Sequence, residues 1–134
     1  MTDAFDADVL IFAAHGDPRG DAAYDAIAGG GELVGSLLLL PETLSRPMRL
    51  GDDTELSGLG ALLARLDLKP VDREVARAAT QFAAEYRLRA ADAVHLATAV
   101  VWGAERFHTN NRRDFAPGIR EIEIVLPPDP SEGI

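Results

Sequence analysis

Short runs of apolar residues divide the chain into predicted strands separated by polar or helical segments. The run 33–40 is mostly apolar and is followed by Pro41, which is typical of a strand buried on both faces of a parallel sheet. Residues 121–126 alternate between polar and apolar before two prolines, which favours a strand nearer the sheet edge. Residues 105–109 predict a further short strand. Residues 6–14 fit either a strand or a strand that turns into a helix near its start.

Apolar residues at helical spacing predict helices between these strands. The segments with this spacing are 21–28, 59–66, 71–86 and 90–102. Asp72 stands where an N-cap is expected for the third of them, and Gly103 is placed to end the fourth. Strands that alternate with helices predict an α/β fold with a mainly parallel sheet.

The length and composition indicate one domain with a packed core. The chain has 134 residues, of which 47% are hydrophobic, so we expect a single domain over 1–134 with a loose tail at 127–134. It has no cysteine, which excludes disulfides, thiolate metal sites and cysteine nucleophiles. The N-terminus lacks the basic start of a signal peptide, and no apolar run approaches the ~20 residues that span a bilayer. These features predict a cytoplasmic protein without a membrane partner.

The charge is acidic overall but unevenly distributed. Thirteen basic residues stand against 22 acidic ones, and the net charge of −9 disfavours binding of nucleic acid by general attraction to phosphates. Residues 73–113 depart from this balance, because they carry seven arginines and four acids. Arginine suits bidentate contacts to phosphate, although most of these arginines are expected on solvated helix faces.

Asp92 is the most informative single residue. It is the only formally charged residue in the segment 90–104, which is otherwise mostly alanine, valine and leucine. A helix that is apolar nearly all round is a buried helix, and an unpaired carboxylate in it is costly. Two interpretations are equally open: Asp92 caps the helix by accepting backbone N–H bonds, or it points into a metal site.

Other acids stand where strands are predicted to end. Asp6 and Asp8 lie near the end of the first strand, and Glu42 follows the apolar run 33–40. The carboxyl ends of parallel strands open onto the ligand crevice, so these acids and Asp92 are candidates to converge. Mg²⁺ and Mn²⁺ prefer such oxygen ligands. Taken alone, each acid is more simply a surface or capping residue.

The polar segment 109–115 follows the last short strand. It offers a hydroxyl, two amides and the carboxylate of Asp114 beside two arginines. By itself this composition predicts only a polar turn. His15, His95 and His108 show no metal-ligand spacing with one another and are interpreted as structural.

Four segments together resemble a PIN domain, most closely the VapC-type toxin ribonucleases of toxin–antitoxin pairs. They occur in the family order and span most of the chain: 5–11 (FDADVLI), 41–44 (PETL), 90–99 (AADAVHLATA) and 107–115 (FHTNNRRDF). The third and fourth are the most specific. The resemblance implies a three-layer α/β/α fold around a mainly parallel sheet of about five strands.

The resemblance also implies a function: the Mg²⁺- or Mn²⁺-dependent endoribonuclease toxin of a type II pair, which cleaves RNA with a metal-activated water. Its catalytic acids would map onto Asp6, Glu42, Asp92 and Asp114. Its metal ligands would be Asp6, Asp92, Asp114 and Asn111. The arginines placed to steer RNA would be Arg46, Arg112 and Arg113. RNA and a cognate antitoxin are the implied partners, and a homodimer is left open.

One position departs from the family pattern. Where the family commonly has aspartate two residues after the threonine, this chain has Asn111. Asparagine offers a carbonyl oxygen but no charge, so we expect weaker metal binding. Asp114 is a candidate to take over part of the missing role.

Two alternatives belong to other functional classes. A non-catalytic binding module would use the acids to bind arginines of a partner, and Asn111 keeps this alternative open. A haloacid-dehalogenase-type phosphatase is a weaker alternative, because it rests on the spacing of Asp6 and Asp8 and on residues 51–53. In that family a lysine precedes the late acidic motif, whereas Lys69 follows it here.

Overall fold

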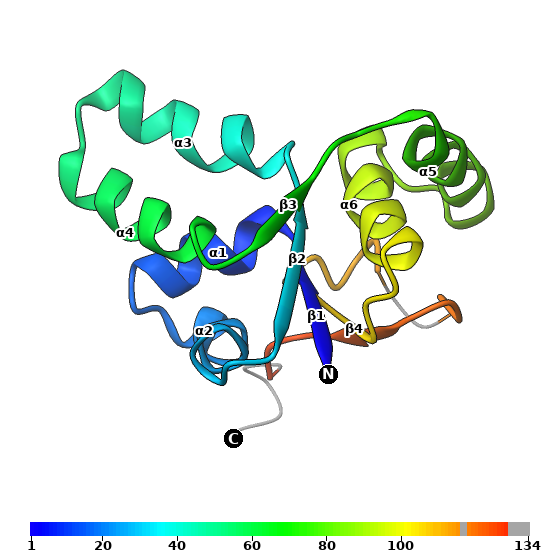
Figure 1. Ribbon diagram of the computed structural model, residues 1–134, viewed down its shortest axis with the longest axis horizontal. Coiled ribbons are helices and arrows are strands. Elements are labelled where there is room, and N and C mark those ends of the chain that lie inside the picture. The colour runs from blue at the N-terminus through cyan, green and yellow to red at the C-terminus, as the bar shows by residue number, and fades with distance from the viewer. Residues whose placement is uncertain (116–117, 129–134) are drawn as a thin grey trace.

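The computed structural model, which describes residues 1–115 and 118–128, has a five-stranded sheet between two layers of helices (Figure 1). The strands are β1 (Thr2–Phe5), β2 (Glu32–Ser36), β3 (Asp67–Lys69), β4 (Arg106–His108) and β5 (Glu123–Val125). They lie in the order β3-β2-β1-β4-β5, and every neighbouring pair is parallel. The predicted α/β class with a parallel sheet is confirmed, and the carboxyl ends of all five strands lie at one edge.

Helices cover both faces of this sheet (Figure 1). One layer holds α1 (Ala7–Ala14), the 3₁₀ turn η1 (Pro18–Gly20), α2 (Asp21–Ala28), α3 (Leu39–Leu50) and α4 (Asp53–Leu63). The other layer holds α5 (Arg73–Tyr86) and α6 (Ala90–Val101). Successive side chains of β1 serve both layers: Phe5 packs in the first core with Leu10, and Ala4 packs in the second with Leu96. None of the described helices is long and apolar enough to cross a membrane.

Local capping signals determine where several helices begin and end. β1 ends at Phe5, and the Asp6 side chain accepts the Ala7 N–H at the start of α1, so residues 6–14 form a helix entered from a strand. The predicted cap Asp72 is confirmed, because its carboxylate accepts the Val75 N–H at 2.9 Å. Gly103 follows α6 with a φ of 74°, a conformation that ends the helix.

The strand predicted over 33–40 is wrong in its second half. β2 ends at Ser36, whose hydroxyl accepts the Leu38 N–H, and α3 begins at Leu39. Pro41 therefore lies in the first turn of a helix, where its missing N–H has no intrahelical acceptor to lose.

Two further boundaries differ from the sequence prediction. The helix predicted over 59–66 begins earlier, at Asp53, because the Asp52 side chain caps it by accepting the Glu55 N–H. β3 was not predicted at all, since three residues carry too weak a pattern. Of the predicted loose tail at 127–134, residues 129–134 lie outside the described part, and Pro127 is buried.

Candidate active site

An acidic hollow lies at the carboxyl ends of β1 and β4. Asp6 follows β1, residues 109–111 follow β4, and Asp92 projects from the first turn of α6. The hollow has a volume of about 550 Å³ and is lined by Asp6, Ala7, Asp8, Asp92, Asn110, Asn111, Arg112 and Arg113. Parallel strands place their carboxyl ends at one edge of the sheet, which is why residues more than 80 positions apart meet here.

Asp6 is a buried carboxylate held on both oxygens. Its Oδ1 accepts the Ala7 N–H at 2.8 Å, and its Oδ2 accepts the Thr109 hydroxyl at 2.8 Å. Thr109 is fully buried, so its hydroxyl is fixed by the end of β4. The Asp6 carboxylate therefore has one defined orientation in the wall of the hollow.

Asp8 lines the same hollow as Asp6, and the pKa of its carboxyl group is raised. It accepts the Val9 N–H at 2.6 Å and the Asn110 N–H at 3.1 Å. Burial, and next the charge of Asp6, raise the pKa of Asp8 to about 6, although these hydrogen bonds act in the opposite direction. From the sequence, Asp8 was a candidate to converge with Asp6, but it was not among the site residues that the family resemblance implies.

Asp92 does not cap its helix, so the capping interpretation is wrong. The N-cap of α6 is Arg89, and the Asp92 carboxylate accepts one hydrogen bond, from Asn111 Nδ2 at 3.4 Å. Burial, followed by the charges of Asp6 and Asp114, raises the pKa of Asp92 to about 6. Within the described residues, no ion pair involves Asp6, Asp8 or Asp92.

Asn111 links two carboxylates through its amide. Its Nδ2 donates to Asp114 Oδ2 at 2.9 Å and to Asp92, while its Oδ1 accepts the Asp114 N–H at 3.2 Å. The amide nitrogen therefore faces the acids. The carbonyl oxygen, which was expected to serve as a metal ligand, already accepts the backbone N–H of Asp114. Asp114 does not line the hollow; it acts on it through its hydrogen bond with the Asn111 amide and through its charge, which helps to raise the pKa of Asp92.

Glu42 lies beside the hollow rather than in its wall. It projects from the first turn of α3, does not line the hollow, and contacts His95 Nε2 through its Oε1. Of the four acids that were candidates to converge, Asp6, Asp8 and Asp92 line the hollow, and Glu42 does not. His95 was interpreted as structural from the sequence. Its contact with Glu42 was not predicted, because the two residues are 53 positions apart.

The three predicted RNA-contacting arginines differ in their surroundings. Arg113 lines the hollow and is exposed. Arg112 also lines it, but its Nη2 donates to the Pro127 carbonyl and so holds the segment after β5. Arg46 is exposed on α3 one turn after Glu42 and does not line the hollow.

The donor chemistry suits a hard divalent cation. In residues 1–115 and 118–128, no three His, Cys, Asp or Glu side chains form a ready cage for an ion. Mg²⁺, however, is commonly bound by one or two carboxylates and several waters. Asp6 and Asp92 supply such oxygens, and neither carboxylate forms an ion pair within the described residues.

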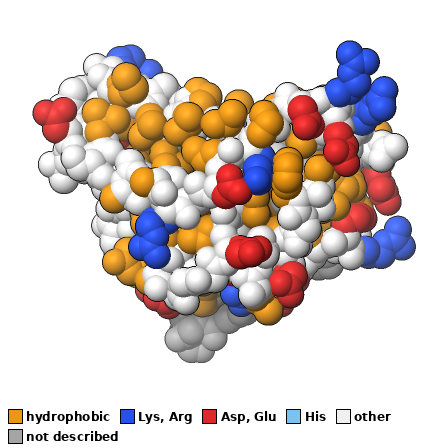
Figure 2. All heavy atoms as spheres, viewed as in Figure 1, with side chains coloured by type: hydrophobic (Ala, Val, Ile, Leu, Met, Phe, Trp, Pro, Cys, Tyr) orange, Lys and Arg blue, Asp and Glu red, His pale blue; other side chains and the backbone are white. Residues whose placement is uncertain are grey.

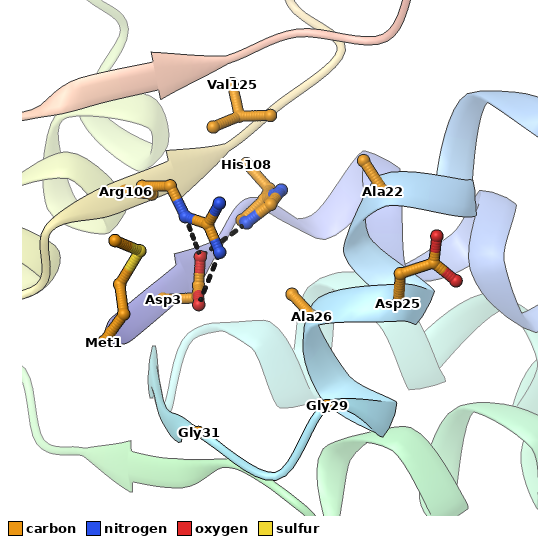
Figure 3. Close-up of a pocket in the computed structure, with 10 residues that line it drawn as sticks. All are labelled: Met1, Asp3, Ala22, Asp25, Ala26, Gly29, Gly31, Arg106, His108 and Val125. Atoms are coloured by element: carbon orange, nitrogen blue, oxygen red, sulfur yellow. Dashed lines mark hydrogen bonds and ion pairs between the residues drawn. The ribbon is translucent and has the colours of Figure 1, made fainter.

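A second hollow, of about 530 Å³, lies between α2 and strands β1, β4 and β5 (Figure 3). Figure 3 shows the side chains of Arg106 and His108 converging on Asp3. Arg106 donates to the two Asp3 oxygens at 2.7 and 3.2 Å, and His108 Nε2 lies 2.9 Å from Oδ1. His108 also stacks on Phe5, with ring centroids 5.0 Å apart. This cluster ties β1 to β4, in agreement with a structural role for His108.

Residues 51–53, the second support for a phosphatase, serve as helix boundaries. Gly51 ends α3 in the left-handed conformation, and Asp52 caps α4 through the Glu55 N–H at 3.0 Å. Capping therefore explains the Asp52 carboxylate, and Asp53 is the first residue of α4.

Comparison with known proteins agrees with this architecture. Among curated proteins, none matches the sequence. The solved structures it resembles include a toxin–antitoxin complex from Klebsiella pneumoniae, with 26% identity over 94% of this chain and 98% of that one and a TM-score of 0.76. Two less similar structures share the fold. DNA-bound VapBC from Salmonella typhimurium is 21% identical over 93% of this chain and 97% of that one, with a TM-score of 0.74. VapBC2 from Rickettsia felis, bound to a promoter DNA fragment, is 15% identical over 93% of this chain and 98% of that one, with a TM-score of 0.74.

The family assignment rests on the sequence match together with the structure. The PIN domain family matches residues 4–117, a range that begins within β1 and includes the residues of the carboxylate hollow. The chain belongs to the PIN domain family.

Proposed function

We propose that this chain is a VapC-type toxin, a Mg²⁺- or Mn²⁺-dependent endoribonuclease that cuts single-stranded or loop RNA. The observation that carries the proposal is the gathering of Asp6, Asp8 and Asp92 in one hollow without a basic partner among the described residues. Such a cluster opposes folding through mutual repulsion, so a functional role explains its presence better than a structural one.

The residues of the hollow have different proposed roles in hydrolysis. Asp6 and Asp92 would hold the divalent ion, which when bound supplies an activated water and offsets charge on the phosphate. Thr109 and the Ala7 N–H fix the Asp6 carboxylate, and the Asn111 amide restrains Asp92. Arg113 stands at the same hollow and attracts the RNA phosphate toward a chain that is acidic overall.

An antitoxin protein is the partner that we propose for this chain. The structural neighbours are toxin–antitoxin and VapBC complexes. Figure 2 shows apolar side chains gathered along the face that carries α3, and Leu37, Met48, Leu50 and Val71 are exposed. Exposed apolar surface of this kind supports protein association, by an antitoxin or by a second copy.

Cleavage of a mixed-sequence RNA pool tests the proposed activity. The purified chain should cut RNA with Mg²⁺ or Mn²⁺ and stop when a chelator is added. A chain that cuts no RNA with either ion, yet binds a partner protein, would be a non-catalytic binding module.

The affinity for Mn²⁺ should depend on pH. Asp8 and Asp92 each have a pKa raised to about 6, so protons compete with the ion as the pH falls through this value. We expect the affinity, measured by electron paramagnetic resonance of free Mn²⁺, to rise between about pH 5 and about pH 7 and then level off. An affinity that stays constant over this interval would contradict the assignment of the ion to this hollow.

Replacing Asn111 by aspartate should strengthen ion binding and weaken the ion-free fold. The change adds a charge beside Asp92 and removes the amide hydrogens that Asp92 and Asp114 accept. We expect about tenfold tighter Mn²⁺ binding and a lower melting temperature without the ion. Asp114→Asn is the matched control and should change binding less, because Asp114 does not line the hollow and affects Asp92 only through its charge and the Asn111 amide. The reverse pattern would make Asp114 the fourth ligand.

A further inference from the structure

His95 has a buried ring nitrogen that lacks a hydrogen-bond partner in the part of the chain that the structure describes. The residue lies on α6, three positions after Asp92, and is only 2% exposed. Its Nε2 contacts Glu42 Oε1, whereas its Nδ1 is buried and has no hydrogen-bond partner among residues 1–115 and 118–128. Buried polar atoms are nearly always paired, so an unpaired one calls for a reason to keep the residue.

The contact with Glu42 supplies that reason. Because Nδ1 meets no acceptor, the ring hydrogen belongs on Nε2, where Glu42 accepts it. A leucine or phenylalanine would fill the same core position without leaving a polar atom unpaired. Packing therefore does not account for histidine at position 95, and the hydrogen bond to Glu42 does.

This hydrogen bond joins two layers of the molecule. Glu42 stands on α3, which packs against α1 and α4, whereas His95 stands on α6, which packs against α5 on the other side of the sheet (Figure 1). The Glu42 side chain is 32% exposed, so without His95 it would be free to turn into solvent. Its charge also acts on Asp92, so its position matters to the hollow.

We propose that His95 is a positioning residue that holds one oxygen of Glu42 beside the carboxylate hollow and leaves the other oxygen for the reaction. Within the described residues, Glu42 Oε2 has no hydrogen-bond partner on the protein. This inference rests on the proposed nuclease function. In this proposal His95 affects the reaction only by positioning Glu42.

The pairing itself can be tested without any activity. ¹⁵N NMR of the full chain should place the ring hydrogen on Nε2, and this hydrogen should exchange slowly with water. In Glu42→Ala it should exchange more than about tenfold faster, because its acceptor is gone. A hydrogen on Nδ1, or equal exchange in both proteins, would overturn the pairing.

Two amide variants separate positioning from packing. Glutamine can place its amide nitrogen near the position of Nε2, where Glu42 can accept its hydrogen. Asparagine places its amide nitrogen near the position of Nδ1, which has no acceptor among the described residues. We expect His95→Gln to keep kcat within a few-fold of wild type and His95→Asn to lose about 10–100-fold in kcat with little change in KM. Melting curves establish that both variants are folded. Equal losses in both variants would overturn the positioning role.

A double-mutant cycle completes the test. If His95 acts only through Glu42, then His95→Asn should not lower the residual activity of Glu42→Ala any further. A further loss in the double variant would contradict the proposal. A wild-type chain that cuts no RNA overturns the proposed function, whereas the exchange measurement separately decides whether Glu42 and His95 are paired.

Discussion

Asp92→Asn is expected to abolish RNA cleavage while raising the melting temperature of the ion-free protein near pH 7.5. The variant removes a carboxylate proposed to hold the divalent ion, so we expect the cleavage rate to fall by more than about 100-fold. It also removes a charge that burial and neighbouring acids make unfavourable, which is why the pKa of Asp92 is raised to about 6. Loss of activity with a gain in stability is the signature of a functional carboxylate.

The pH dependence gives this prediction a second readout. A carboxyl whose pKa rises on folding contributes stability that is complete below its unfolded pKa, near 3.8, and is lost as the pH rises through about 6. The difference in melting temperature between Asp92→Asn and wild type should therefore be largest above about pH 6 and shrink toward about pH 4. A variant that melts earlier than wild type at neutral pH, or that cuts RNA at a similar rate, would contradict the interpretation.

Asp3→Ala is expected to destabilise the fold by about 3 kcal/mol, the largest stability loss that we predict. Asp3 is buried between Arg106 and His108, and its removal leaves a buried imidazole and a half-buried guanidinium without their acceptor. Urea unfolding measures the change. Asp67→Asn is the control, since the Asp67–Lys69 pair is exposed on the Asp67 side and should add little.

The pH dependence of the Asp3 contribution has the opposite sign to that of Asp92. Burial alone would raise the pKa of Asp3, but hydrogen bonds from Arg106 and His108 outweigh it and lower the pKa below 3.8. Its stabilisation is therefore present above about pH 4 and lost as the pH falls further. A loss of less than about 1 kcal/mol in Asp3→Ala at neutral pH would show that the cluster does not tie β1 to β4.

Features with a local physical cause were predictable from the sequence. The bounds of α2, the cap at Asp72 and the end of α6 before Gly103 depend on residues within one helical turn. The charge of Asp92 in an apolar helix and the place of Asp6 after a strand likewise needed no tertiary information. These signals, with the family resemblance, located the candidate site.

Features set by distant contacts were not predictable. The leucines of 37–40 suit a buried strand and a helix equally, and the turn at Ser36 decides between them. β3 exists through its pairing with β2, where Val34 lies opposite Asp67. The orientation of the Asn111 amide and the pairing of His95 depend on partners brought together by the fold, so no spacing in the sequence reveals them.

Anomalous scattering from Mn²⁺ in crystals of the full chain tests the central claim most directly. We predict a peak within about 2.5 Å of carboxylate oxygens of both Asp6 and Asp92, in the hollow at the carboxyl ends of β1 and β4. The same crystals of Asp92→Asn should lack it. An ion bound elsewhere, or none in the hollow at saturating Mn²⁺, would contradict the claim that these carboxylates form a metal-dependent active site.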